Sequence, residues 1–410
     1  MMYQEEITQS RYRWYILILA TVSYGLVVGA ERLCLPPLFP EIVADLNITM
    51  TQMGTIWGMD PLAGVFVGLA SGLLIDRFGI KWTLSAACLL AGITGAARGL
   101  STGFISMTAT MFIFGLVVAM LPTLVPKVAA VWFAGRNLAF ANGVLTLGMT
   151  GGAMIGTMLS ATVLSPLLGG WANVLFLYGV PPVLLGILWW VTSREPSHFH
   201  AGVKKTSEVP FREALPHVIR LKGIWGIGFV FLGAFGAFMG LSGYLPTYLR
   251  DIGWAASAAD SALTVIVGTT AVSSIPMALL SDKIGSRKKV LVPSLIISLA
   301  SLAMLPLVDG LAIWVLLVIN GLMRGAMFPL FIAIQVELEG VGARYAGTAV
   351  GLTSSLGMLG AFAAQPLGMN LVGIYGGGAP LYFWAGLSFV TMTGFFFVKE
   401  LQRKPAMKTP

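Results

Sequence analysis

The chain has 410 residues, of which 57% are hydrophobic and only 10% are charged, so it cannot cover the water-facing surface of a soluble domain. Its net charge of +8 would suit a nucleic-acid partner, but no basic stripe with interleaved aromatic residues is present. Composition therefore excludes an ordinary soluble or nucleic-acid-binding protein and predicts a chain surrounded by lipid.

Apolar runs recur along the whole chain, each long enough to cross a hydrocarbon core of about 30 Å. Because these runs are continuously apolar and do not alternate in polarity, they indicate helices and not strands. We therefore expect an all-α membrane protein with twelve transmembrane helices. The predicted spans are 14–37, 53–75, 82–100, 104–133, 138–164, 171–192, 223–249, 259–281, 288–307, 310–336, 344–372 and 378–398.

The basic residues favour one side of the membrane. With these spans, most of the 25 lysines and arginines fall in one alternating set of loops, whereas the opposite loops carry Arg250 among several acids. The positive-inside rule then places both termini in the cytoplasm of a multi-pass plasma-membrane protein. The basic surplus is thus explained by topology and by contact with lipid headgroups.

One long polar stretch, residues 193–222, divides the spans six and six. We predict an N-terminal six-helix bundle at 1–192, a cytoplasmic linker at 193–222 and a C-terminal six-helix bundle at 223–410. The three histidines of the chain, His198, His200 and His217, lie in this linker without a regular ligand spacing. We therefore predict no metal site, and the sequence indicates no cofactor.

The two halves repeat. A loop motif built on Gly72, Asp76, Arg77 and Gly79 after the second span is answered 206 residues later by Asp282, Lys283 and Gly285 after the eighth. A second match, Leu-Gly-Met-x-Gly at 147–151 and 356–360, lies 209 residues apart. Such near-constant spacing indicates an internal duplication.

Twelve spans with this loop motif resemble the major facilitator superfamily. The resemblance implies two pseudo-symmetric six-helix bundles that move a solute by alternating access, usually as a monomer. It also implies a latch on the cytoplasmic side, in which Asp76 and Asp282 face a helix N-terminus and basic side chains such as Arg136 and Arg344. The alternative for these aspartates is a tight turn in a solvated loop.

Charged residues inside spans cost roughly 2.5–3.5 kcal/mol each on insertion scales, so each is a candidate functional residue. We expect Arg324 to offer a planar fork to a carboxylate or sulfonate, unless it pairs with Glu31 or Asp60. The other predicted substrate contacts are Arg32, Lys127, Tyr244 and Tyr248. The alternative for Lys127 is that its side chain snorkels to the headgroups, and the alternative for the two tyrosines is that they are interface aromatics.

Two acids are candidates for carrying a coupling proton. Glu31 beside Arg32 looks like the Asp-Arg pair of the superfamily's anion:cation symporters. Asp60 is the second candidate, although before Pro61 it could simply cap the backbone of a kink. Adjacent residues on a helix point about 100° apart, so Glu31 and Arg32 should meet different neighbours. Arg98, near the end of its span, is expected to snorkel to headgroups.

Glycines at positions 148, 152 and 156 share one face of the fifth span and predict a close helix contact. The leading functional hypothesis is import of a small organic anion with a proton. The alternatives are a drug or metabolite exporter working as a proton antiporter, an inorganic anion permease for nitrate or cyanate, and a sensor without transport. We do not expect an enzyme, because no His-Glu-x-x-His and no nucleotide-binding loop occurs in the sequence.

Overall fold

The computed structural model describes residues 2–67, 70–133, 137–193 and 211–398. These residues are almost entirely helical, and no β-strand occurs among them. Eleven helical segments within them are long and apolar enough to cross a membrane. The twelfth predicted span, 53–75, passes through residues 68–69, which lie outside the described part. The all-α membrane class is therefore confirmed.

The chain divides into two compact units, each described by itself below. The first contains Met1–Lys204 together with Ala255–Thr264, and the second contains Lys205–Trp254 together with Val265–Pro410. Neither unit is a continuous stretch of the sequence, because the start of one later helix groups with the first unit. The predicted bounds of the two bundles and the linker stay predictions.

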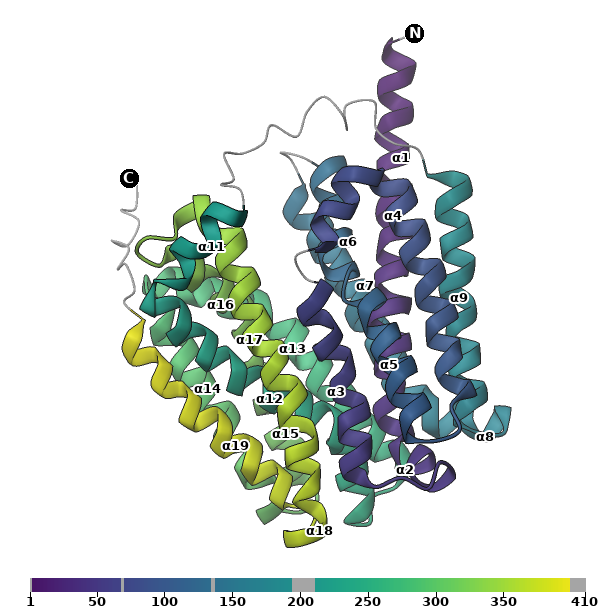
Figure 1. Ribbon diagram of the computed structural model, residues 1–410, viewed down its shortest axis with the longest axis vertical. Helices are drawn as coiled ribbons and strands as arrows, with labels where there is room; N and C mark the ends of the chain where they lie inside the picture. Colours follow the sequence, from purple (N-terminus) through teal and green to yellow (C-terminus); the bar gives the residue numbers. More distant parts are fainter. Residues whose placement is uncertain (1, 68–69, 134–136, 194–210, 399–410) are drawn as a thin grey trace. The chain divides into compact units, whose positions relative to one another are not determined.

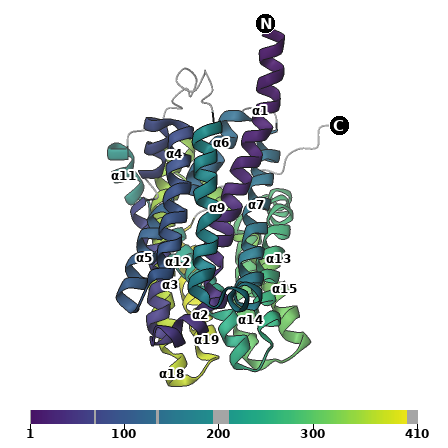
Figure 2. The same cartoon turned by 90° about the vertical axis from the view of Figure 1, so that its right-hand side faces the viewer.

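The helices of the first unit follow the predicted spans closely, and α9 lies alongside α4 (Figures 1 and 2). The predicted span 14–37 is made by three consecutive helical segments, and the span 171–192 coincides with α9. The elements are α1 (Met2–Ser23), η1 (Tyr24–Glu31), α2 (Leu35–Asp45), α3 (Met50–Val67), α4 (Ala70–Ala97), η2 (Arg98–Leu100), α5 (Phe104–Val118), α6 (Leu121–Trp132), α7 (Leu138–Leu159), η3 (Ser160–Leu164), α8 (Ser165–Leu168) and α9 (Trp171–Thr192).

The second unit is built around α12, which packs along α17 and α19 (Figure 1). Its elements are α11 (Phe211–Ile219), α12 (Lys222–Asp251), α13 (Ala256–Ile284), α14 (Lys288–Met304), η4 (Leu305–Leu307), α15 (Leu311–Arg324), α16 (Met327–Glu337), α17 (Gly342–Asn370), α18 (Val372–Tyr375), α19 (Ala379–Thr391) and η5 (Met392–Phe397). The first residues of α13 belong to the other unit, as stated above.

Part of the predicted linker is ordered structure. Its last third forms α11, whose Val218 is buried in the hydrophobic core of the second unit. His217 Nε2 lies 2.8 Å from the carbonyl oxygen of Gly340, and its ring stacks on Tyr345 with centroids 4.4 Å apart. This histidine therefore fastens α11 to the loop before α17, whereas His198 and His200 lie outside the described residues.

The last glycine of the duplicated loop motif has a left-handed φ angle in both units. Gly79 interrupts α4 with φ of 80°, and Gly285 follows α13 with φ of 73°. These left-handed values are open to glycine at little cost and strain other residues. The motif glycine is thus required at each copy by the turn itself, which supports the duplication inferred from sequence.

The predicted close contact of the glycine face of α7 is confirmed. A Cβ atom on Gly152 would overlap the backbone of Gly25, and one on Gly156 would press on the backbone of Ala30. The partner is η1, a π-helical segment of eight residues that continues α1. An equivalent approach occurs in the second unit, where a Cβ atom on Gly360 would meet the carbonyl oxygen of Leu232. Small residues thus allow helices to meet backbone to backbone in each unit.

Candidate functional site

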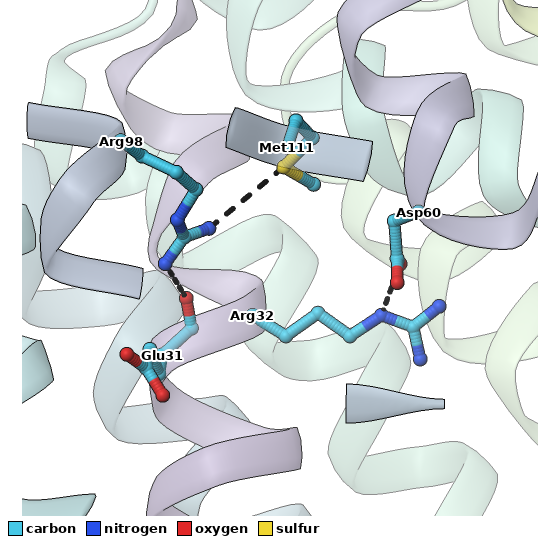
Figure 3. Close-up of polar contacts among 5 residues, drawn as sticks. All are labelled: Glu31, Arg32, Asp60, Arg98 and Met111. Atoms are coloured by element: carbon cyan, nitrogen blue, oxygen red, sulfur yellow. Dashed lines mark hydrogen bonds and ion pairs between the residues drawn. The ribbon is translucent and has the colours of Figure 1, made fainter. Parts of the chain in front are cut away.

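Glu31 is the most unusual side chain of the first unit. It ends the π-helical segment η1, a type of distortion that is often found at functional sites. The residue is fully buried, and neither carboxyl oxygen has a hydrogen-bond partner among the described residues (Figure 3). The space beside it depends on Gly95, since a Cβ atom there would overlap Oε1 of Glu31. The buried carboxyl group therefore occupies a space that only a glycine at position 95 leaves open.

Arg98 lies next to Glu31 inside the first unit, and the expectation that it snorkels to the headgroups is wrong. The residue is fully buried, and its Nε and Nη2 donate to the carbonyl oxygens of Gly95 and Glu31, each at 3.0 Å. Its Nη1 lies 3.9 Å from the sulfur of Met111 (Figure 3). Its Cζ lies 3.7 Å above the ring of Phe114. The guanidinium is held inside the unit by backbone carbonyls, a sulfur and an aromatic face.

Arg32 and Asp60 form an ion pair. Nε of Arg32 lies 2.5 Å from Oδ2 of Asp60, with the side chains 23% and 2% exposed (Figure 3). Glu31 and Arg32 therefore reach different neighbours, as their angular separation on the helix predicts. Each charge of the pair is compensated by the other, so a substrate or a proton that binds here has to compete with it. Their predicted roles in substrate binding and proton coupling stay predictions.

Arg324, at the end of α15, is the corresponding feature of the second unit. The residue is only 7% exposed, and its Nη1 has no hydrogen-bond partner among the described residues. Its Cζ lies 4.3 Å above the ring of Phe238 of α12. It lines a cavity of about 20 Å³ together with polar side chains of α14, α15 and α19, namely Ser298, Asn320 and Ser388.

Asn320 precedes Arg324 by one helical turn and organises the polar side of this cavity. Its Nδ2 donates to Ser298 at the carbonyl and at the hydroxyl, and to the hydroxyl of Ser301, over 2.9–3.1 Å. Its Oδ1 has no partner in the described part of the chain. Sequence reasoning missed Asn320 because it screened spans for charges only. An amide four residues before an intramembrane arginine on one helix face was the available signal.

The other predicted substrate residues have more ordinary surroundings. Tyr244 is fully buried and donates to the carbonyl oxygen of Gly377 at 3.1 Å, and its ring packs near Tyr248 and Trp384. Tyr248 is also buried. Lys127 of α6 is half-buried. The predicted contacts of these residues with substrate stay predictions.

The second copy of the loop motif carries an ion-pair network. Nη1 of Arg287 lies 2.6 Å from Oδ1 of Asp282, and Nη2 lies 3.2 Å from Oε1 of Glu337 at the end of α16. Burial lowers the pKa of Arg287, but hydrogen bonds and attraction to Glu337 and Asp282 outweigh it and raise the pKa above its usual value. Arg344 and Lys283 are exposed. The surroundings of Gly72, the side chains of Asp76 and Arg77, and all of Arg136 lie outside the described part.

The comparison with protein families gives one match that covers nearly the whole chain. The family model described as "Major Facilitator Superfamily" matches residues 17–269 and 249–410 in two overlapping segments. The left-handed turn at the motif glycine of both units agrees with this match.

Two curated relatives are distant in sequence. The chain is similar to the probable nitrate/nitrite transporter NarK2 of Mycobacterium tuberculosis, with 26% identity over 62% of this chain and 63% of that protein. The chain thus matches somewhat less than two thirds of that relative's length. It is also similar to the sialic acid transporter NanX of Escherichia coli K12, with 27% identity over 83% of each chain. Among solved structures, a mutant of the nucleoside transporter NupG has a TM-score of 0.76 at 15% identity, over 94% of this chain and all of the other, a likeness of fold alone.

Proposed function

The chain belongs to the major facilitator superfamily, and we propose that it imports a small organic anion of carboxylate or sulfonate type by proton symport. As a multi-pass membrane protein of this family it is a secondary transporter, which generally has no enzymatic role. The substrate class, the coupling ion, the plasma-membrane location with cytoplasmic termini and the cycle of alternating access are parts of the proposal.

The buried guanidinium of Arg324 carries the proposal. A cation in an apolar environment is costly unless an anion or several acceptors compensate its charge, and Nη1 of Arg324 lacks an acceptor in the described part of the chain. Its planar fork suits a carboxylate or a sulfonate, with Asn320 one turn away as a further polar contact. The ring of Phe238 below the guanidinium keeps it aimed by a cation–π contact. The relatives named for nitrate/nitrite and sialic acid both carry anions, which supports the substrate charge.

Glu31 is the proposed proton carrier. Of the two candidate acids, Asp60 is already compensated by Arg32, whereas the carboxyl group of Glu31 has no hydrogen-bond partner among the described residues. A buried acid without a partner is far cheaper to hold neutral than charged, so it binds a proton whenever its surroundings are dry. Hydration during the transport cycle would release that proton. Arg98, bonded to the carbonyl oxygen of Glu31, would hold the backbone that carries the acid.

The cytoplasmic latch remains part of the proposal. The turn at Gly285 and the pairing of Asp282 with Arg287 support a rigid loop at the second copy, and Gly79 makes the matching turn at the first. A carboxylate held in this turn would be available to a helix end or a basic side chain in one state of the cycle. The contacts of Asp76, Arg77, Arg136 and Arg344 in such a latch are proposed from the family resemblance.

Uptake into proteoliposomes tests the proposal. Labelled carboxylates, sulfonates and nitrate would be offered with and without an inward proton gradient, to the wild type, Arg324→Gln, Glu31→Gln and the exposed control Arg220→Gln. We expect gradient-driven uptake of an organic anion, lost in Arg324→Gln and kept in Arg220→Gln. Glu31→Gln should still exchange anion for anion but lose its response to the gradient.

Each alternative gives a different result in the same assay. Uptake of nitrate in preference to any organic anion would make the chain an inorganic anion permease, as the nitrate/nitrite relative suggests. Extrusion of apolar cations against protons would make it an exporter. Normal anion uptake by Arg324→Gln would remove the proposed anion site, and normal gradient response of Glu31→Gln would remove the proposed proton carrier.

A further inference from the structure

A second cavity of the second unit is lined by aromatic side chains. It has a volume of about 110 Å³ and lies between α12, α16 and α17. All three helices contribute side chains to its wall: Phe231 and Phe235 from α12, Phe328 and Phe331 from α16, and Met358 from α17. Phe328 meets Phe231 and Phe235 edge to face, with ring centroids 6.0 and 5.8 Å apart. The cavity therefore offers aromatic ring surfaces in the perpendicular geometry that aromatic pairs favour.

One polar group in this apolar wall has no partner. Gln335, one turn after Phe331 on the same face of α16, lines the cavity and is only 2% exposed. Its Oε1 has no hydrogen-bond partner among the described residues. A buried carbonyl oxygen without a donor is expensive, so its retention here calls for an occupant that donates a hydrogen bond. Ser354 of α17 lies on the wall contributed by that helix.

We propose that this cavity binds an aromatic ring that carries a hydrogen-bond donor, and that the ring belongs to the transported anion. The cavity's volume of about 110 Å³ is of the same order as the apolar cavity of about 150 Å³ that accepts benzene, so it has space for one six-membered ring at most. A fused ring system would be too large. The donor, such as a phenolic hydroxyl, would satisfy Oε1 of Gln335.

The same aromatic cluster reaches the proposed anion site. Phe328 and Phe235 of the cavity wall lie 6.3 and 5.9 Å, centroid to centroid, from Phe238, and the guanidinium of Arg324 lies on the ring of Phe238. A substrate with a carboxylate and an aromatic ring would therefore find complementary groups within one cluster of side chains. The identification of the ring as part of the transported anion rests on the proposed function, whereas the ring site itself does not.

Binding to the purified full-length protein, measured by calorimetry, tests the inference. The probes are 4-hydroxybenzoate, benzoate, cyclohexanecarboxylate and phenol. We expect benzoate to bind about tenfold more tightly than cyclohexanecarboxylate, because only the aromatic ring can make edge-to-face contacts with the phenylalanines. The hydroxyl group should improve binding a further fivefold or so in the wild type, and this gain should vanish in Gln335→Met, which keeps the shape but lacks the acceptor.

Two serines of α17 give a matched pair for the cavity. Ser354→Leu fills it and should abolish the preference for aromatic probes, whereas Ser355→Leu, whose wild-type hydroxyl bonds to Gly351 of its own helix, adds the same volume elsewhere. The inference is overturned if aromatic and aliphatic carboxylates bind equally, or if Ser354→Leu and Gln335→Met bind as the wild type does.

The same measurements distinguish failure of the ring site from failure of the proposed anion site. If aliphatic carboxylates bind as well as aromatic ones and only Arg324→Gln loses them, the proposed function stands and the ring site falls. If phenol binds as tightly as benzoate, with loss in Ser354→Leu but none in Arg324→Gln, the ring site stands while its link to an anionic substrate falls.

Discussion

Removal of the guanidinium from the ion pair between Arg32 and Asp60 should destabilise the first unit markedly. The two groups lie 2.5 Å apart, and Asp60 is only 2% exposed, so Arg32→Gln leaves a buried carboxylate without its counter-charge. Breaking a buried pair in this way costs about 3–5 kcal/mol. At roughly 2–4 °C per kcal/mol for a unit of this size, the apparent Tm should fall by about 6–20 °C.

A double variant makes this prediction specific. Arg32→Gln combined with Asp60→Asn removes both charges and should recover most of the lost Tm, because no uncompensated charge remains. Unfolding can be followed by tryptophan fluorescence of the purified protein in detergent. The exposed Lys289 supplies the control, and Lys289→Gln should shift the Tm by only about 1 °C. An unchanged Tm in Arg32→Gln, or a double variant no more stable than that single variant, would refute the reasoning.

Two further predictions concern helix packing and the second loop motif. Gly152→Ala should lower the free energy of unfolding by about 1–3 kcal/mol, because its methyl group would overlap a carbonyl of η1. The control Gly151→Ala meets open space and should be neutral or stabilising. Thermal unfolding of the two variants is the measurement, and equal effects would contradict the packing. Glu337→Gln should lower the Tm in low salt, and at pH 7 and about pH 10 alike, because a raised pKa keeps Arg287 charged until the pH exceeds that pKa. A loss that disappears at the higher pH would show that the arginine is not the partner that matters.

The spans and the duplication could be predicted because both are local properties of the sequence. A run of apolar residues is long enough to cross a bilayer wherever it occurs, and the turn at Gly79 and Gly285 is set by a few neighbouring residues. The glycine face of α7 was also predictable, since a spacing of four places residues on one face whatever the partner is. The partner itself, a π-helical segment, has no clear signature in hydrophobic periodicity.

The contents of the candidate site depended on contacts between distant helices. Arg98 was expected at the headgroups because an arginine near a span end usually reaches them, but the carbonyl oxygens of Gly95 and Glu31 and the face of Phe114 hold it inside. Gln335 went unnoticed because an uncharged amide costs too little in a hydropathy profile to stand out. The aromatic cavity that Gln335 lines is formed only where α12, α16 and α17 pack together.

At Gly152 and Gly156 the nearest atoms of η1 are main-chain atoms, so natural variation cannot adjust this contact in small steps. Alanine, the smallest replacement for glycine, already puts a methyl group where Gly152 now faces the backbone of Gly25. A lineage that changes one helix must therefore shift the whole backbone of the other or keep both as they are. Descendants of this chain should inherit these glycines as a set, while the side chains around them remain free to diversify.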